Sequence, residues 1–196
     1  MPTLYDVEAY LNGVLLLARK RTDGFAWLDL SADGFWRSFW SILYALPALS
    51  VSWASYRNAY LAHVEGADAG AGFVLRLAFI DVATWVLPLV VIGLIARPIG
   101  VERHFPRFVV ATNWLGTLSA YALALPSVLR MVLPGGDDLV LLASIAVFFL
   151  VVFLLFRITR LSFDGDASSA TFVTIVSIVV SLALSGLMQR ILGVAG

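Results

Sequence analysis

Residues 73–96 read FVLRLAFIDVATWVLPLVVIGLIA, and this stretch decides the fold class. As a helix rising 1.5 Å per residue it is about 36 Å long, which is enough to cross the hydrocarbon core of a bilayer. It is also the only long apolar stretch that carries a base and an acid well inside its run, Arg76 and Asp81, and it contains Pro88. The pattern predicts a membrane-spanning helix with polar groups at depth.

The composition extends this prediction to the whole chain. Of the 196 residues, 61% are hydrophobic and only 13% are charged, with a mean hydropathy of +0.93. A soluble domain averages about 25% charged residues. The net charge is zero, so no basic field indicates a nucleic-acid partner. We therefore expect an all-α, polytopic membrane protein whose main partner is the lipid bilayer.

Four further apolar stretches predict four more spanning helices. The five expected spans are residues 35–57, 73–96, 108–130, 139–156 and 170–192. The fourth is almost entirely bulky and apolar, so we expect it to be the most lipid-exposed.

The N-terminal region predicts a helix that does not span. Residues 4–18 place apolar side chains on one helical face but are too few to cross a bilayer. This amphipathic helix either lies in the interface or packs against the protein's own bundle. The expected organisation is a cytoplasmic segment at 1–34 and a transmembrane domain at 35–196.

The basic residues predict an orientation. With five crossings, one side of the membrane receives nine of them: Arg19, Lys20, Arg21, Arg37, Arg97, Arg103, Arg107, Arg157 and Arg160. The other side receives the remaining four: Arg57, Arg76, Arg130 and Arg190. The positive-inside rule then places the N-terminus in the cytoplasm and the C-terminus outside. The preference for Arg over Lys is typical of GC-rich bacteria, so we expect a bacterial inner membrane.

Asp81 is the sharpest functional candidate. A charge at bilayer depth costs at least about 3 kcal/mol, so such a residue usually faces the bundle interior and has a partner. Arg76 lies five residues earlier, which is not the spacing of an intrahelical pair, and it can extend to the interface instead. Asn113, Thr117 or the serines of the last helix are candidate partners, or Asp81 stays protonated. Either a structural contact or a proton or ion site fits this pattern.

Prolines form a second pattern. Pro47 and Pro88 both fall near mid-membrane on consecutive helices, and Pro126 lies near the end of the third. Each proline frees a backbone carbonyl one turn earlier. Transporters use broken helices to build midplane sites, but a simple kink is equally compatible, with Thr84 re-satisfying the backbone near Pro88.

Small residues recur every four positions on two of the predicted helices. The series are Thr112, Gly116, Ala120 and Ala124 on the third, and Ser177, Ser181 and Ser185 on the fifth, ending at Gln189. Such stripes favour close helix packing, and a wetted serine path is the alternative.

No motif in the sequence indicates catalysis. The chain has no cysteine, and His63 and His104 fall in loops on opposite sides of the predicted membrane. Residues 164–166 (Asp-Gly-Asp) read either as a metal-binding pair or as a turn with a helix cap. We expect no catalytic residue, no metal, no cofactor and no enzymatic activity.

Five helices with a cytoplasmic N-terminal segment, an outside C-terminus and early proline kinks resemble the YIP1-domain membrane proteins, over residues 35–192. The resemblance is one of topology, because the Asp-Leu-Tyr-Gly-Pro signature of the eukaryotic members is absent and no residue role carries over. It implies a scaffold or trafficking-type adaptor without catalysis.

Two functions follow from these observations. The first is a non-enzymatic inner-membrane scaffold or adaptor that associates with another membrane protein or with itself. The second is a small secondary transporter or ion-conducting subunit that uses Asp81 near the kinked helices.

Overall fold

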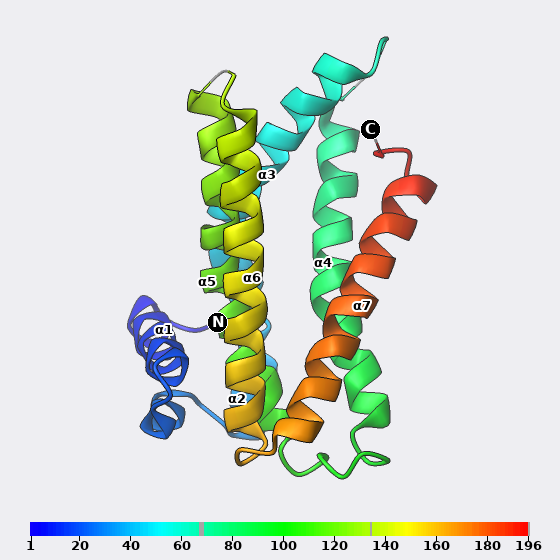
Figure 1. Ribbon diagram of the computed structural model, residues 1–196. Helices are drawn as coiled ribbons and strands as arrows, with labels where there is room; N and C mark the ends of the chain where they lie inside the picture. The colour runs from blue at the N-terminus through cyan, green and yellow to red at the C-terminus, as the bar shows by residue number, and fades with distance from the viewer. Residues whose placement is uncertain (67–68, 134, 196) are drawn as a thin grey trace.

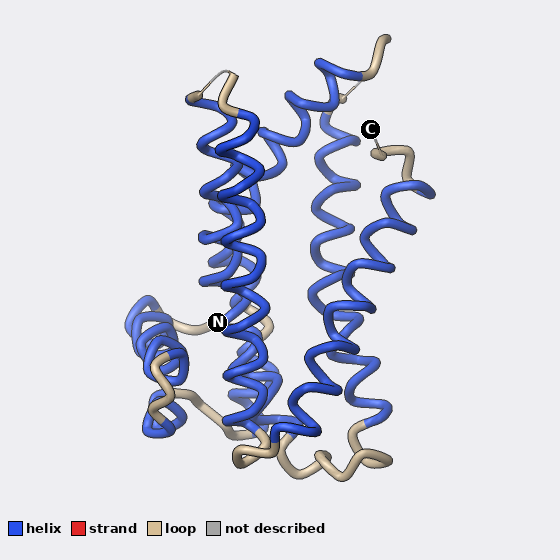
Figure 2. Tube along the Cα trace, in the orientation of Figure 1, coloured by secondary structure: helices blue, strands red, loops and turns tan. Residues whose placement is uncertain are grey.

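The computed structural model describes residues 1–66, 69–133 and 135–195. Within these ranges the chain forms seven α-helices and one 3-10 helix and contains no strand, which confirms the all-α class. The elements are α1 (Leu4–Ala18), η1 (Thr22–Trp27), α2 (Ala32–Ser38), α3 (Ser41–His63), α4 (Ala71–Ile95), α5 (Phe105–Val132), α6 (Asp137–Ser162) and α7 (Ala167–Ile191) (Figures 1 and 2).

The five long helices form two groups. α5 packs between α3 and α6, while α4 packs mainly against α7. α6 and α7 lie close together where the chain connects them and diverge toward the opposite end of the bundle (Figure 1). This divergence separates the two groups over half the length of the molecule.

Four of the long helices, α4 to α7, are long and apolar enough to cross a membrane. The prediction of five spans is therefore confirmed for four helices and not for α3. That helix has 23 residues, but its second half carries Ser52, Ser55, Arg57 and Asn58, which lower its hydropathy. α6 is the least buried of the four spans, as its uniformly apolar sequence predicts.

The helix predicted at 35–57 is wrong in its bounds. The structure divides this region into α2 and α3, and α3 continues to His63, into the expected loop. At the break, the amides of Phe39 and Trp40 bond to carbonyls three residues back rather than four. The Ser38 hydroxyl also donates to the Phe35 carbonyl at 2.7 Å, so a side chain competes for the backbone acceptor that a continuous helix would use.

The N-terminal helix has the predicted bounds, and one of its faces packs against the bundle. α1 packs against α5 and α6, with Val14 and Leu17 fully buried in a core shared with Trp114 and Ile158. Gly13 faces Gly24 of η1 so closely that a Cβ on either would meet backbone oxygen within 2.8 Å. The helix is thus part of the bundle rather than a free interfacial element.

The segments predicted to share the basic side lie at one end of the bundle. α2 and the loops at 96–104 and 163–166 lie there together, with α1 and η1 along the side of the bundle nearest that end (Figure 1). Arginines join these segments, because Arg157 donates to the Ala18 carbonyl and Arg107 donates to the Ser162 carbonyl. The Arg107 guanidinium also lies 5.0 Å from the centre of the Phe25 ring.

Candidate functional site

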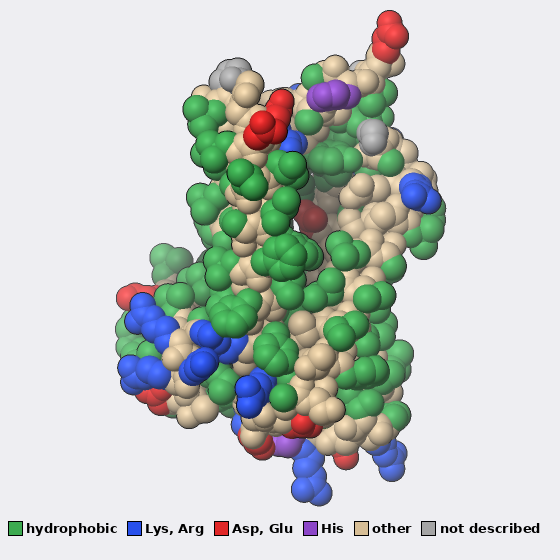
Figure 3. Space-filling model, in the orientation of Figure 1, with side chains coloured by type: hydrophobic (Ala, Val, Ile, Leu, Met, Phe, Trp, Pro, Cys, Tyr) green, Lys and Arg blue, Asp and Glu red, His purple; other side chains and the backbone are tan. Residues whose placement is uncertain are grey.

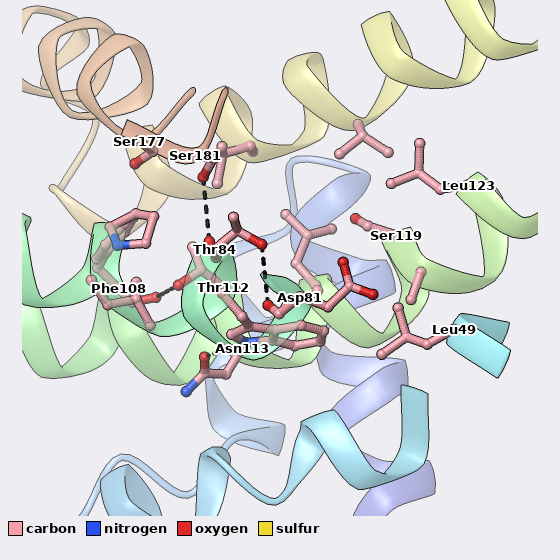
Figure 4. Close-up of a pocket in the computed structure, with 18 residues that line it drawn as sticks. Leu49, Asp81, Thr84, Phe108, Thr112, Asn113, Ser119, Leu123, Ser177 and Ser181 are labelled. Carbon is pink, nitrogen blue, oxygen red and sulfur yellow. Dashed lines mark hydrogen bonds between the residues drawn. The ribbon is translucent and has the colours of Figure 1, made fainter. Parts of the chain in front are cut away.

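A cavity of about 330 Å³ lies between the two helix groups, and Asp81 is on its wall. Side chains from all five long helices line it, and the close-up shows those labelled from α3, α4, α5 and α7 around one space (Figure 4). The lining residues are Leu49, Asp81, Thr84, Trp85, Pro88, Leu89, Phe108, Thr112, Asn113, Leu115, Gly116, Ser119, Ala120, Leu123, Val151, Leu155, Ser177 and Ser181.

The cavity opens on the side of the bundle. The space-filling view shows the surface hollowed between α6 and α7, with an acidic side chain at the floor of the hollow (Figure 3). Asp81 is the only acidic residue that lines it. A second groove of about 490 Å³, between α2, α4 and α5, has only apolar side chains and glycine along its walls. Of these two cavities, the α6–α7 cleft is therefore the one with polar side chains on its wall.

Trp53 is the hydrogen-bond partner of Asp81. Its indole Nε1 donates to Asp81 Oδ2 at 2.6 Å, which links α3 to α4 about 15 Å along the axis from Ala71. Sequence reasoning missed this partner, because an aromatic near a helix end is expected to mark the membrane interface. The bond uses one oxygen of the carboxyl group, and the other oxygen has no hydrogen-bond donor among the described residues.

Arg76 does not neutralise Asp81. Its guanidinium donates to the Leu192 carbonyl at 2.9 Å, at the C-terminal end of α7, and the side chain is exposed. None of the ion pairs among the described residues includes Asp81. The carboxyl group therefore lies in the cleft with a neutral donor and no cation beside it.

Asn113 and Thr117, the candidate partners on the third predicted span, are buried in a different network. Asn113 accepts a hydrogen bond from Trp85 at 3.0 Å and donates to Ser38 at 2.8 Å. Thr117 donates to the Ser41 carbonyl at 2.9 Å. These contacts join α5 to α2, α3 and α4, so both residues fix helix positions and neither contacts the Asp81 carboxyl group.

The backbone at Pro88 is re-satisfied in a way that differs from the prediction. Pro88 frees the carbonyl of Thr84, and this oxygen accepts a long hydrogen bond of 3.4 Å from Ser181 on α7. The Thr84 hydroxyl instead donates to the carbonyls of Ile80 and Asp81. The proline of α4 is thus coupled to α7 beside the cleft, whereas Pro47 and Pro126 do not line it.

The small-residue series on α5 contacts α3 and α4. Ala120 and Ala124 pack against two alanines of α3, and Gly116 lies beneath the ring of Trp85. Thr112 lines the cleft and donates to the Phe108 carbonyl.

The serine series on α7 divides between the cleft and its rim. Ser177 and Ser181 line the cavity, whereas Ser185 does not and accepts a hydrogen bond from Gln189 at 3.0 Å. The first two serines of the predicted path, Ser177 and Ser181, therefore share one space with Asp81.

The acidic triplet at 164–166 forms a turn and a cap. Asp166 accepts hydrogen bonds from the Ser168 amide at 2.9 Å and the Ser169 hydroxyl at 2.6 Å, at the start of α7. Asp164 pairs with Arg107 and with His104. The hydrogen bond and charge of Arg107, assisted by His104, lower the pKa of the Asp164 carboxyl group. No cluster of three metal-ligating side chains exists in the part of the chain that the structure describes.

No family model, curated protein or solved structure matches this chain.

Proposed function

We propose that this multi-pass membrane protein is a small transporter that binds its substrate or a proton at Asp81. One observation carries the proposal: a carboxyl group without a cationic partner lies on the wall of an open cavity within the spanning helices. An intramembrane carboxyl that only held helices together would be sealed between them with its hydrogen bonds complete. Among the described residues Asp81 has a single side-chain donor, Trp53, and it lines the cavity.

We include α3 as a fifth crossing in this proposal. Its 23 residues extend about 35 Å, and it packs against α5 before it slants toward the end of α4 (Figure 1). Close packing supports this, because Ala45 and Ala48 contact the alanines of α5. The buried Ser41 and Ser55 are among the residues that lower its hydropathy without facing lipid. With five crossings, the nine-to-four bias of basic residues supports a cytoplasmic N-terminus.

Cysteine accessibility tests the proposal directly, since the chain has no native cysteine. Ser119→Cys places a thiol on the cavity wall, and the matched control Leu150→Cys places one on the exposed apolar surface of α6. In a lipid bilayer, a transport cavity is reached by water during the cycle, so a small charged methanethiosulfonate reagent should modify Ser119→Cys. The control should stay unmodified. A Ser119→Cys protein as unreactive as the control would contradict a transport cavity.

A scaffold or adaptor is the second candidate, and the outer face of α3 favours it. This face exposes Pro47, Ser50, Ala54 and Asn58 at helical spacing, together with Leu43 and Leu61. Small and polar side chains among leucines suit contact with another helix as well as with lipid. The predicted resemblance to YIP1-domain proteins belongs with this candidate. Co-purification of a membrane partner, weakened by Ala54→Leu, would support it, and a partner-free monomer in mild detergent would contradict it.

A further inference from the structure

The chemistry of the cleft narrows the kind of ligand it holds. We propose that the α6–α7 cleft binds an organic ammonium ion with an apolar body, which enters sideways from the bilayer. This inference rests on the proposed function and names its substrate class.

The charge of Asp81 is not balanced within the protein. Asp81 Oδ2 accepts a hydrogen bond from Trp53, whereas Oδ1 has no donor and no Lys, Arg or His forms an ion pair with the carboxyl group among the described residues. The nearest basic side chains are held elsewhere: Arg57 donates to the Ala69 carbonyl and Arg76 to the Leu192 carbonyl. An ionised carboxylate at this depth is therefore stabilised most by a cation that arrives with the ligand.

Most hydroxyl groups on the wall of the cleft can act only as hydrogen-bond acceptors toward a ligand. The hydroxyls of Thr84, Thr112, Ser177 and Ser181 all donate their protons to backbone carbonyls. A hydroxyl whose proton is used in this way presents only lone pairs to the cavity. Together with the carboxylate, these groups present acceptors to the cavity, and among the described lining hydroxyls only that of Ser119 makes no such bond to a carbonyl. Such a wall suits a ligand that carries N–H donors and disfavours an anion.

The size of the cavity and its apolar lining indicate an organic ligand. A cavity of about 330 Å³ is far larger than a bare metal ion needs, and the described residues hold no cluster of metal ligands there. Most of the remaining lining is aliphatic or aromatic, including Leu49, Leu123, Trp85 and Phe108. Aromatic faces attract cations, and apolar walls stabilise an apolar body. An amine that bears a hydrocarbon or aryl group meets all of these features.

The route follows from where the cleft opens. Its mouth lies between α6 and α7 on the side of the bundle (Figure 3), and Val151 of α6 is one of the residues that line the cavity. The neighbouring surface of α6 exposes Phe149 and Leu150, as expected of a helix in contact with lipid. A ligand that has partitioned into the bilayer therefore reaches the cleft without crossing the polar ends of the bundle.

Calorimetric titration of the protein in lipid nanodiscs tests the ligand class. The probes are 2-phenylethylamine, its neutral analogue 2-phenylethanol and the similarly sized anion 3-phenylpropionate, each titrated also into empty nanodiscs. We expect the amine alone to bind, and Asp81→Asn to weaken it at least about tenfold, because a buried charge pair loses one partner. Equal binding of the anion, or unchanged amine affinity in Asp81→Asn, would overturn the inference.

Two further variants and a control separate loss of binding from misfolding and test lateral entry of the ligand. Ser119→Leu fills the cavity without touching the Trp53–Asp81 bond and should also abolish amine binding. Val151→Trp obstructs the mouth and should weaken binding, whereas Phe149→Trp on the exposed face should not. If Ser119→Cys is water-accessible but no amine binds, the ligand class is wrong and the transport proposal stands. If Ser119→Cys is not water-accessible and no amine binds, both the transport proposal and the ligand class are wrong.

Discussion

Gly116 is the position at which a single methyl group should report on the packing beneath the cleft. A Cβ there would lie 2.4 Å from Trp85 Cζ2 and 2.8 Å from Cη2, both in the rigid part of the ring. The ring cannot move freely, because its Nε1 donates to Asn113 at 3.0 Å. Gly116→Ala therefore forces the Trp85 ring to shift and strains or breaks that bond.

The magnitude follows from three contributions. Overpacking a tight core costs about 1–3 kcal/mol, and a lost hydrogen bond costs about 0.5–1.5 kcal/mol. The higher helix propensity of alanine offsets up to about 1 kcal/mol. We expect Gly116→Ala to lower the free energy of unfolding by about 1–3 kcal/mol.

The assay is equilibrium unfolding in mixed micelles, followed by tryptophan fluorescence. Gly186→Ala is the matched control, because a Cβ on this helical glycine of α7 meets nothing within 4 Å. The control should be neutral or slightly stabilising. If Gly116→Ala is as stable as Gly186→Ala, the close contact between α4 and α5 is refuted.

Three further predictions concern contacts outside that core. Trp53→Phe keeps an aromatic ring but removes the hydrogen-bond donor to Asp81, so the free energy of unfolding should fall by about 1–2 kcal/mol. An unchanged free energy of unfolding would mean that the bond does not form. Arg107 lowers the pKa of the Asp164 carboxyl group, so their pairing stabilises the fold above the unfolded pKa of about 3.9, and this stabilisation is lost as the pH falls below it. Asp164→Asn should therefore reduce the fall in the free energy of unfolding at acid pH, and an unchanged fall would contradict the pairing. Gly24→Ala places a Cβ 2.4 Å from an α1 carbonyl and should speed tryptic cleavage between α1 and η1, where equal rates would exclude the close approach.

The sequence predicted those parts of the fold that hydropathy and periodicity control. α1 has the expected bounds, and four apolar stretches form helices close to their predicted ranges. The break before α3 could not be read from the sequence, because it depends on Ser38, whose hydroxyl bonds to the chain and to Asn113 of a distant helix. Tertiary contacts override a continuous helical pattern at this point.

Several of the residues named from the sequence line the cavity, whereas Arg76, Pro47 and Pro126 do not, and the hydrogen bonds between them were not predicted. Asp81 and two of the serines share this cavity, since polar groups in spanning helices turn away from lipid. Trp53, the partner of Asp81, was not among the predicted site residues, because an aromatic near a helix end is expected at the membrane interface. The serine that reaches the Pro88 kink comes from α7, and no spacing along the chain could pair those helices.

The most direct test of the transport proposal is the protonation of Asp81 in a lipid bilayer. Infrared difference spectra of wild type against Asp81→Asn, over about pH 4–9, isolate the carboxyl band of this residue. A transport cavity predicts that this band changes with pH in this range and exchanges rapidly in deuterated water, because water reaches the cavity during the transport cycle. A band that stays in one form and exchanges slowly would contradict it and would make Asp81 a sealed contact between α3 and α4.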